Sequence, residues 1–115
     1  TTAEEREARE TALQEAYRSA ALVPLETAQA CYEVIALAQA AAEQGNANSI
    51  SDAGVGALMA RAGVEGAALN VLINLGSVTD VAFVTDTKAR AAYLIARAET
   101  EAAIVLDRVK AAIGN

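Results

Sequence analysis

Residues 52–70, DAGVGALMARAGVEGAALN, decide the fold of this chain, because so apolar and alanine-rich a segment favours a buried helix. Two sets of residues recur along it with helical spacing. The larger side chains, which we expect to fill a core, are Val55, Leu58, Met59, Ala62 and Leu69. A second set at i, i+4, i+7 and i+11 is small and consists of Gly56, Ala60, Gly63 and Ala67. Glycine inside a helix costs about 1 kcal/mol relative to alanine, so this small-residue set predicts the close approach of another helix.

The composition of the whole chain is that of an all-α protein. Hydrophobic residues make up 54% of its 115 residues and aromatic residues only 3%, and alanine is the best helix former. Pro24 lacks an N–H and crowds the preceding turn, so we expect it to end one helix and begin the next. The spacing then predicts four helices: Ala3 to Leu22, Pro24 to Gln44, Asp52 to Asn70 or beyond, and from a start between Val78 and Asp86 to Ile113.

Long helices joined by short loops favour an antiparallel bundle. Four helices from so short a chain make a thin core, since a domain of this size buries only about two-thirds of its unfolded surface. The segment at 52–70 is also apolar on more than one face, and such a helix is normally buried on more than one side. We therefore expect further burial against a second subunit or against another part of the same protein.

The residue types that are missing exclude several kinds of site. No histidine is present, which excludes histidine general bases and the usual zinc sites, and we expect no metal centre. A single cysteine excludes an intrachain disulfide. The formal net charge of −6 disfavours nucleic acid as a partner. We expect no membrane partner, because Arg61 and Glu65 interrupt the most apolar region, and without a signal peptide we expect a cytoplasmic protein.

The polar residues between 46 and 52 are the first candidate site. This segment holds two asparagines, two serines and an aspartate directly before the apolar helix. One interpretation is a polar loop in which Ser49 or Ser51 caps the helix. The other is a binding loop whose donors, with Asn48 and Asp52, converge on a polar ligand at the helix N-terminus.

Other polar residues could likewise have either a structural role or a ligand-binding role. Asn70 and Asn74, four residues apart, either satisfy backbone groups at the helix end or bind a heterocycle. Arg61 and Glu65 form either an ion pair or a contact with an anionic substrate tail.

The remaining side chains that could carry chemistry are more simply core residues. Cys31 and Met59 are expected to be buried and inert. The three tyrosines, Tyr17, Tyr32 and Tyr93, are expected to be core residues with a polar tip.

Four segments together resemble the cyclodeaminase/cyclohydrolase family, which includes the cyclodeaminase domain of formiminotransferase-cyclodeaminase and bacterial methenyltetrahydrofolate cyclohydrolases. They are NANSISDAGV at 46–55, EGAALNV at 65–71, INL at 73–75 and the proline-led helix start VPLE at 23–26. The resemblance covers essentially the whole chain. It implies an all-helical, dimeric domain that acts on one-carbon derivatives of tetrahydrofolate.

The resemblance implies two alternative reactions. One closes 5-formiminotetrahydrofolate to 5,10-methenyltetrahydrofolate with loss of ammonia, and the other hydrolyses the methenyl compound to 10-formyltetrahydrofolate. Neither needs a metal or a prosthetic group, because a carboxylate with a tuned pKa can transfer the proton. The matching positions predict that Asn48, Ser49 and Asp52 line or brace the folate site, with Asn70 and Asn74 as further candidates. Asp52 is the one carboxylate we place near the chemistry, as a positioning group before a base.

The resemblance also implies that the chain is a partial domain. Residues 1–115 match the C-terminal part of the family domain, whose Pro- and Gly-rich start, apolar helix and catalytically important acidic residue all precede the position of Thr1. A complete site would then need another chain or residues beyond these. The alternative is a non-catalytic helical module that joins like chains through its apolar surface.

Overall fold

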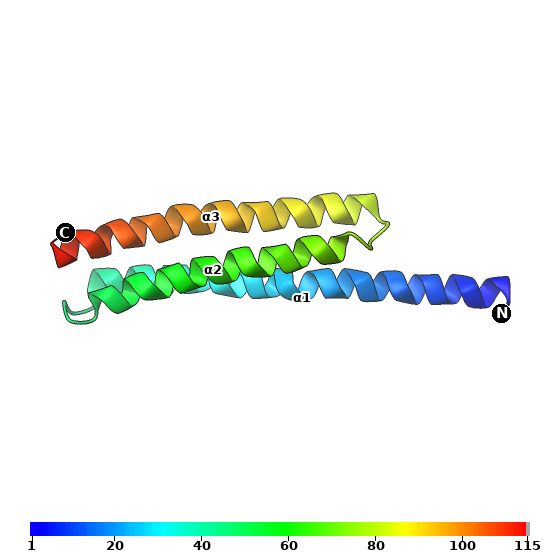
Figure 1. Cartoon of the computed structure of the whole chain (residues 1–115), viewed down its shortest axis with the longest axis horizontal. Helices are drawn as coiled ribbons and strands as arrows, with labels where there is room; N and C mark the ends of the chain where they lie inside the picture. Colours follow the sequence, from blue (N-terminus) through cyan, green and yellow to red (C-terminus); the bar gives the residue numbers. More distant parts are fainter. Residues whose placement is uncertain (115) are drawn as a thin grey trace.

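Three long helices form an antiparallel bundle in the computed structural model, which describes residues 1–114 (Figure 1). Helix α1 spans Ala3–Gln44, α2 spans Ile50–Leu75 and α3 spans Val81–Ile113. The molecule is a rod of 70 × 19 × 16 Å. The described residues contain no strand, so the expected all-α class and antiparallel arrangement are confirmed.

The expected break at Pro24 is wrong, because α1 runs through this residue as one helix of 42 residues. A proline inside a helix loses one backbone hydrogen bond and costs about 3 kcal/mol. Ala21, Leu25 and Ala28 are almost completely buried on either side of it, so packing holds both halves in line. Tertiary packing therefore overrides the local preference, and the chain has three helices instead of four.

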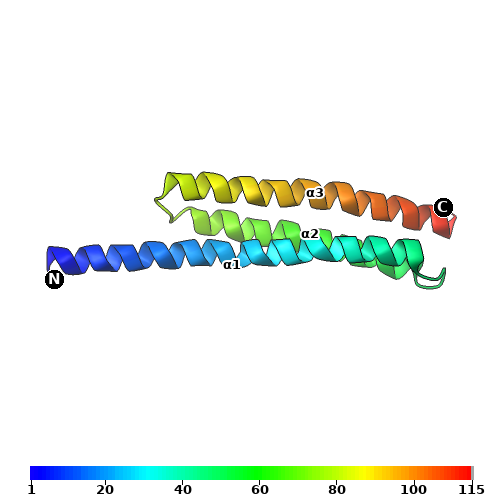
Figure 2. The same cartoon turned by 180° about the vertical axis from the view of Figure 1, so that it is seen from behind.

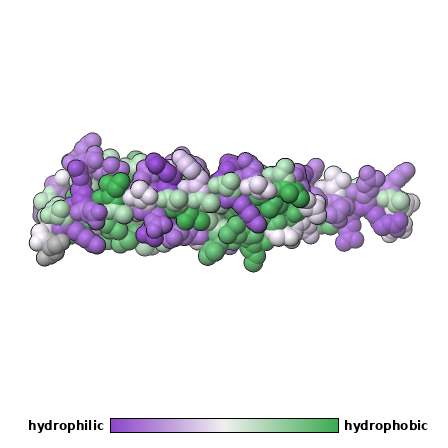
Figure 3. Space-filling view, turned by 90° about the horizontal axis from the view of Figure 1, so that it is seen from above, coloured by the Kyte–Doolittle hydropathy of each residue, from purple (hydrophilic) through white to green (hydrophobic). Residues whose placement is uncertain are grey.

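The first three turns of α1 project beyond the other two helices (Figure 2). Residues 1–12 are all exposed, and this end of the rod is almost entirely hydrophilic (Figure 3). Thr2 caps the helix, since its Oγ1 accepts from the Glu5 backbone N–H at 3.1 Å. The projection is stabilised by its cap and by the helix dipole acting on Glu4 and Glu5.

The loops are held by side chains that the sequence reading did not single out. Between α2 and α3, the Gln14 amide of α1 donates to the Ser77 carbonyl at 3.1 Å and accepts from the Thr79 N–H at 3.0 Å. Asp80 then caps α3, accepting from the Phe83 N–H at 3.1 Å. Gly114 ends α3, with a left-handed φ of 91°.

The core is built mainly from small side chains. More than half of the buried apolar residues are alanines, and the largest side chains that are fully buried include Ile35, Val64, Val71 and Val105. Alanine lets the helix axes approach closely, which explains how three helices fill so thin a rod. Apolar stripes face the core along most of α1 and α3, from Leu25 to Ala42 and from Val84 to Val109.

The expected core face of α2 is wrong, because the large side chains point outward. Val55, Leu58, Met59 and Leu69 are 48–68% exposed, and Ala62 is exposed as well. The buried face instead carries Ala53, Gly54, Ala57, Ala60, Val64, Ala67, Ala68 and Val71. The buried positions of α2 carry small residues because α2 packs against both α1 and α3, and small side chains let the helices approach closely.

The glycines of α2 fall into two groups. A Cβ at Gly63 would lie 2.7 Å from the Sγ of Cys31, and one at Gly54 would lie 3.2 Å from a methyl carbon of Val109. Gly63 belongs to the predicted small-residue set and confirms the expected close approach of another helix, whereas Gly54 lies outside that set. The same expectation is wrong for Gly56. Gly56 and Gly66 have nothing within 4 Å, so no contact in this chain explains them.

Both α1 and α2 contain a stretch that is long and apolar enough to cross a membrane, judged by length and composition alone. The core helix of a soluble protein passes the same test, so this finding is weak evidence. The expectation of no membrane partner stays a prediction.

Candidate functional site

The polar loop before α2 is organised mainly by its own hydrogen bonds. The Oδ1 of Asn46 accepts from the backbone N–H groups of Asn48 at 2.9 Å and Ser49 at 3.2 Å. The Ser49 hydroxyl donates to the Asn46 carbonyl at 3.2 Å. Ser49 occupies the N-cap position, as one of the two interpretations had it, but its hydroxyl makes no capping bond to α2. Asn46 instead closes a turn on the N–H groups of residues 48 and 49, which precede the first residue of α2.

Two other loop residues face solvent. Asn48 is exposed, and Asp52 is exposed in the first turn of α2, where a carboxylate is favoured by the helix dipole. Both side chains are therefore accessible to a ligand or to a second chain.

Asn70 and Asn74 lie at the other end of α2, on the wall of a groove of about 660 Å³ between α1 and α2. The Asn74 amide donates to the Asn70 backbone carbonyl at 2.8 Å, which is the helix-end role that we considered. This bond uses one donor of the Asn74 amide, which leaves its oxygen and a second donor. The rest of the groove is largely apolar and is lined by Ala20, Val23, Pro24, Thr27, Cys31, Gly63, Gly66 and Ala67.

Pro24 contributes to this groove as well as interrupting the hydrogen bonds of α1. Because proline has no N–H, Pro24 cannot donate the helical hydrogen bond that the carbonyl of Ala20 would otherwise accept. Ala20 and Pro24 both line the groove that holds the two asparagines. An apolar groove with a few convergent polar groups is the usual form of a small-molecule site.

The two groups of candidate residues lie at opposite ends of α2. Asp52 and Asn70 are separated by eighteen residues, or about 27 Å at 1.5 Å per residue. A single chain therefore brings Asn70 and Asn74 together in one groove but does not bring Asp52 to them.

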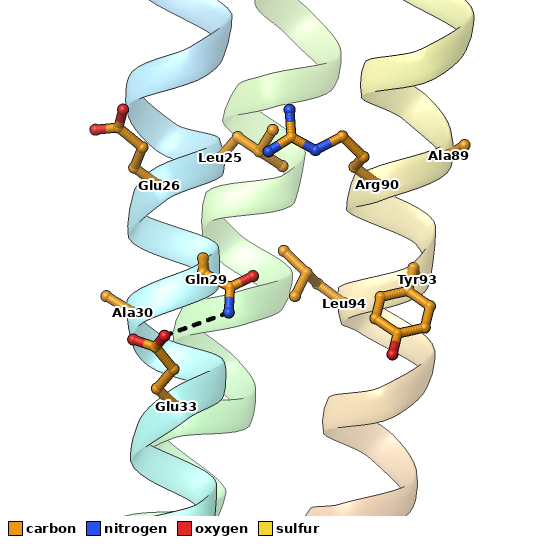
Figure 4. A pocket seen from close by; sticks show the side chains of 9 residues that line it. All are labelled: Leu25, Glu26, Gln29, Ala30, Glu33, Ala89, Arg90, Tyr93 and Leu94. Carbon is orange, nitrogen blue, oxygen red and sulfur yellow. Dashed lines mark hydrogen bonds between the residues drawn. The ribbon is translucent and has the colours of Figure 1, made fainter.

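A second groove, of about 440 Å³, lies between α1 and α3 (Figure 4). Leu25 and Leu94 form apolar walls, and Arg90 extends from α3 toward α1 (Figure 4). The rim carries Glu26 and Glu33 from α1, with the Gln29 amide 3.5 Å from a Glu33 carboxylate oxygen. No pattern in the sequence indicates that these residues of α1 line one groove with α3.

The three tyrosines differ in their burial, and one of them interacts with a charged side chain. Tyr17 and Tyr32 pack against the core as expected, but Tyr93 is 62% exposed on the rim of the second groove, so its expected burial is wrong. Hydrogen bonding to the Glu101 carboxylate raises the pKa of Tyr32, because it favours the protonated phenol. Glu101 also pairs with Arg97 at 3.6 Å.

Arg61 and Glu65 form the ion pair that we considered, at 3.7 Å, and Arg61 also lies 4.0 Å from Glu99 of α3. The thiol of Cys31 is half-buried against Gly63. Met59 is 68% exposed, so its expected core position is wrong.

Comparison with known proteins identifies the family. A family model described as formiminotransferase-cyclodeaminase matches residues 1–93. The chain belongs to the formiminotransferase-cyclodeaminase family. A methenyltetrahydrofolate cyclohydrolase of Methylorubrum extorquens is 42% identical over 112 residues, which cover 97% of this chain and 54% of that protein.

Two mammalian relatives of the family are equally similar. The formimidoyltransferase-cyclodeaminases of Rattus norvegicus and Sus scrofa are 42% and 43% identical over 110 residues. These residues cover 96% of the chain and 20% of each relative. The chain therefore spans about half of the bacterial relative and about a fifth of the mammalian ones, and the resemblance stated from the sequence is confirmed.

Proposed function

We propose that this chain forms the tetrahydrofolate-binding part of a cytoplasmic, oligomeric enzyme domain that converts a one-carbon derivative of the cofactor. Family membership is the observation that carries the proposal, and the names of the relatives specify the substrate class. The groove between α1 and α2 is the binding surface proposed for the folate ring.

The chemistry of the groove suits a heterocycle with several polar edges. A pteridine ring is flat and offers both N–H donors and nitrogen or oxygen acceptors. The Asn70 and Asn74 amides supply donors and acceptors. The apolar walls at Val23, Gly66 and Ala67 would cover the faces of the ring.

Two reactions are compatible with this surface. In hydrolysis, water adds to the methenyl carbon, the bond from that carbon to N5 breaks, and a proton is released. In cyclisation, N10 attacks the formimino carbon and ammonia leaves after taking up a proton. Both steps need a group that holds or moves a proton, and neither needs a resident metal or prosthetic group. We place Asp52 beside this step as a positioning carboxylate, with Asn48 and Ser49 bracing its loop.

The test follows both reactions with the same protein. The absorbance of 5,10-methenyltetrahydrofolate reports hydrolysis, and released ammonia reports cyclisation of the formimino compound. We expect the native full-length protein to accelerate one of the two and to bind the methenyl compound, and we expect Asn74→Ala to weaken that binding. Gln29→Ala, in the other groove, is the matched control and should leave binding unchanged. Rates equal to the uncatalysed ones in both assays, without saturable binding, would contradict the proposal.

A further inference from the structure

The groove between α1 and α3 has the form of a small-molecule site that the proposed function does not use. Its volume of about 440 Å³ lies within the range of about 300–1,000 Å³ that is usual for such sites (Figure 4). The floor is apolar, because Leu25 and Leu94 line it and are only 3% and 4% exposed. It shares no lining residue with the groove between α1 and α2, so the two grooves occupy different faces of α1.

Arg90 gives the α3 edge of this groove a positive charge. Its side chain extends from α3 toward α1 (Figure 4). The other two arginines of α3 are paired, Arg97 with Glu101 at 3.6 Å and Arg108 with Glu43 at 3.5 Å. In the part of the chain that the structure describes, no ion pair includes Arg90. A guanidinium binds a carboxylate through two parallel N–H donors, so this edge is suited to the carboxylate of a ligand.

The α1 edge offers acceptors instead. The Gln29 amide nitrogen donates to a Glu33 carboxylate oxygen at 3.5 Å, so the amide oxygen of Gln29 is left as an acceptor and points toward α3 (Figure 4). Glu26 and Glu33 add two carboxylates to the rim, two helical turns or about 10 Å apart. With Arg90 they leave the groove with one more negative than positive charge, which disfavours a simple anion. A ligand whose carboxylate meets Arg90 must therefore also carry a cation for the α1 edge.

We propose that this groove binds an α-amino acid with an aromatic or branched aliphatic side chain. Because Arg90 reaches across the groove toward the acceptors of α1, the two charges of the ligand must lie close together, as they do on the α-carbon of an amino acid. The carboxylate pairs with Arg90, and the ammonium donates to Gln29 and Glu33. The side chain of the ligand lies on the apolar floor formed by Leu25 and Leu94.

Tyr93 favours an aromatic side chain in the ligand. It follows Arg90 by one turn of α3 and is 62% exposed on the rim of the groove. An aromatic ring that is covered by a second ring gains buried apolar area and a stacked or edge-to-face contact. Phenylalanine is therefore the probe that uses the floor, the rim and both charged edges.

The first experiment separates the two charges with three probes that share a phenyl ring. Phenylalanine carries both charges, 3-phenylpropanoate carries only the carboxylate, and 2-phenylethylamine carries only the ammonium. Calorimetric titration of the native full-length protein should show saturable binding of phenylalanine, and dissociation constants about tenfold higher or more for the other two. No saturable binding of phenylalanine, or equal affinity for a probe with a single charge, would overturn the proposal.

The second experiment removes the cation from the α3 edge. Arg90→Gln should raise the dissociation constant of phenylalanine about tenfold. Lys88→Gln is the matched control, because Lys88 is an exposed cation of the same helix that does not line the groove. Asn74→Ala, in the groove proposed for folate, should also leave the constant unchanged, so failure of this site and failure of the proposed function are told apart. Equal affinities of the Arg90→Gln and Lys88→Gln variants would overturn the proposal.

The third experiment locates the probe by the amide chemical shifts of the isotopically labelled protein. Phenylalanine should shift residues 25–33 and 89–94 and should saturate with the calorimetric constant. Shifts centred on the groove between α1 and α2 would overturn the assignment. Shifts of residues 25–33 and 89–94 that depend on protein concentration without any probe would show a second copy of the chain in this groove, which would also overturn it.

Discussion

Replacement of Gly63 by alanine gives the sharpest test of how α1 and α2 pack. The new Cβ would lie 2.7 Å from Cys31 Sγ and 3.3 Å from Cys31 Cβ, where ordinary carbon contacts begin at about 3.5 Å. Overpacking of this kind costs about 1–3 kcal/mol, and the gain in helix propensity returns about 1 kcal/mol. We expect Gly63→Ala to change the free energy of unfolding by about 0–2 kcal/mol in the destabilising direction.

Gly56→Ala is the control on the same helix. A Cβ at Gly56 meets nothing within 4 Å, so only the helix propensity changes and we expect stabilisation of about 1 kcal/mol. The two alanine variants should therefore differ by about 1–3 kcal/mol, which for a chain of this size is a difference in melting temperature of several degrees. Urea denaturation followed by circular dichroism, at one protein concentration for all variants, measures the difference.

A variant that combines Gly63→Ala with Cys31→Ala completes a double-mutant cycle. Removal of the sulfur leaves only the milder contact at 3.3 Å, so the penalty for Gly63→Ala should fall by about 1–2 kcal/mol. The reasoning would be refuted if Gly63→Ala stabilised the chain as much as Gly56→Ala. It would also be refuted if Cys31→Ala left the penalty unchanged.

Three further predictions concern single polar groups. Thr87→Val should stabilise the chain by about 1 kcal/mol in thermal unfolding, because the Thr87 hydroxyl is buried without a hydrogen-bond partner; a destabilised variant would show that the hydroxyl is satisfied. Gln14→Ala should destabilise it by about 1–2 kcal/mol in urea, because two hydrogen bonds to the α2–α3 loop are lost, whereas Gln29→Ala should cost little. Glu101→Gln should lower the pKa of Tyr32 toward its ordinary 10.0 in an ultraviolet titration. Since the folded-state pKa of Tyr32 is raised, its contribution to stability is present below pH 10 and is lost as the pH rises through the folded pKa; an unchanged titration in the variant would refute the assigned cause.

The fold class and most of the helical content could be predicted from the sequence. Alanine content and the spacing of apolar residues favour helices through interactions between residues that are close in sequence. It failed at Pro24, where the burial of Ala21 and Leu25 outweighs the local cost of proline. Helical spacing could show that α2 has two apolar faces, but not which one meets α1 and α3. The size of the side chains decides this. The face with small residues lets α1 and α3 approach closely, so the face with Met59 is exposed.

The candidate site was only partly predictable for a related reason. The spacing of Asn70 and Asn74 placed them on one side of a helix, and the structure shows that they share a groove with Pro24. That Glu26 and Arg90 line one groove had no sequence signal, because it depends on how α1 and α3 align. Asn46 was grouped with the polar loop, but its role as the acceptor for the loop backbone follows from the turn geometry.

Binding of folate to the groove between α1 and α2 is the central claim, and a titration with 5,10-methenyltetrahydrofolate tests it most directly. The wild-type protein and its Asn74→Ala and Gln29→Ala variants are compared under the same conditions. The account predicts saturable binding that Asn74→Ala weakens and Gln29→Ala leaves unchanged. Equal affinities for all three proteins, or no saturable binding by the wild type, would contradict it.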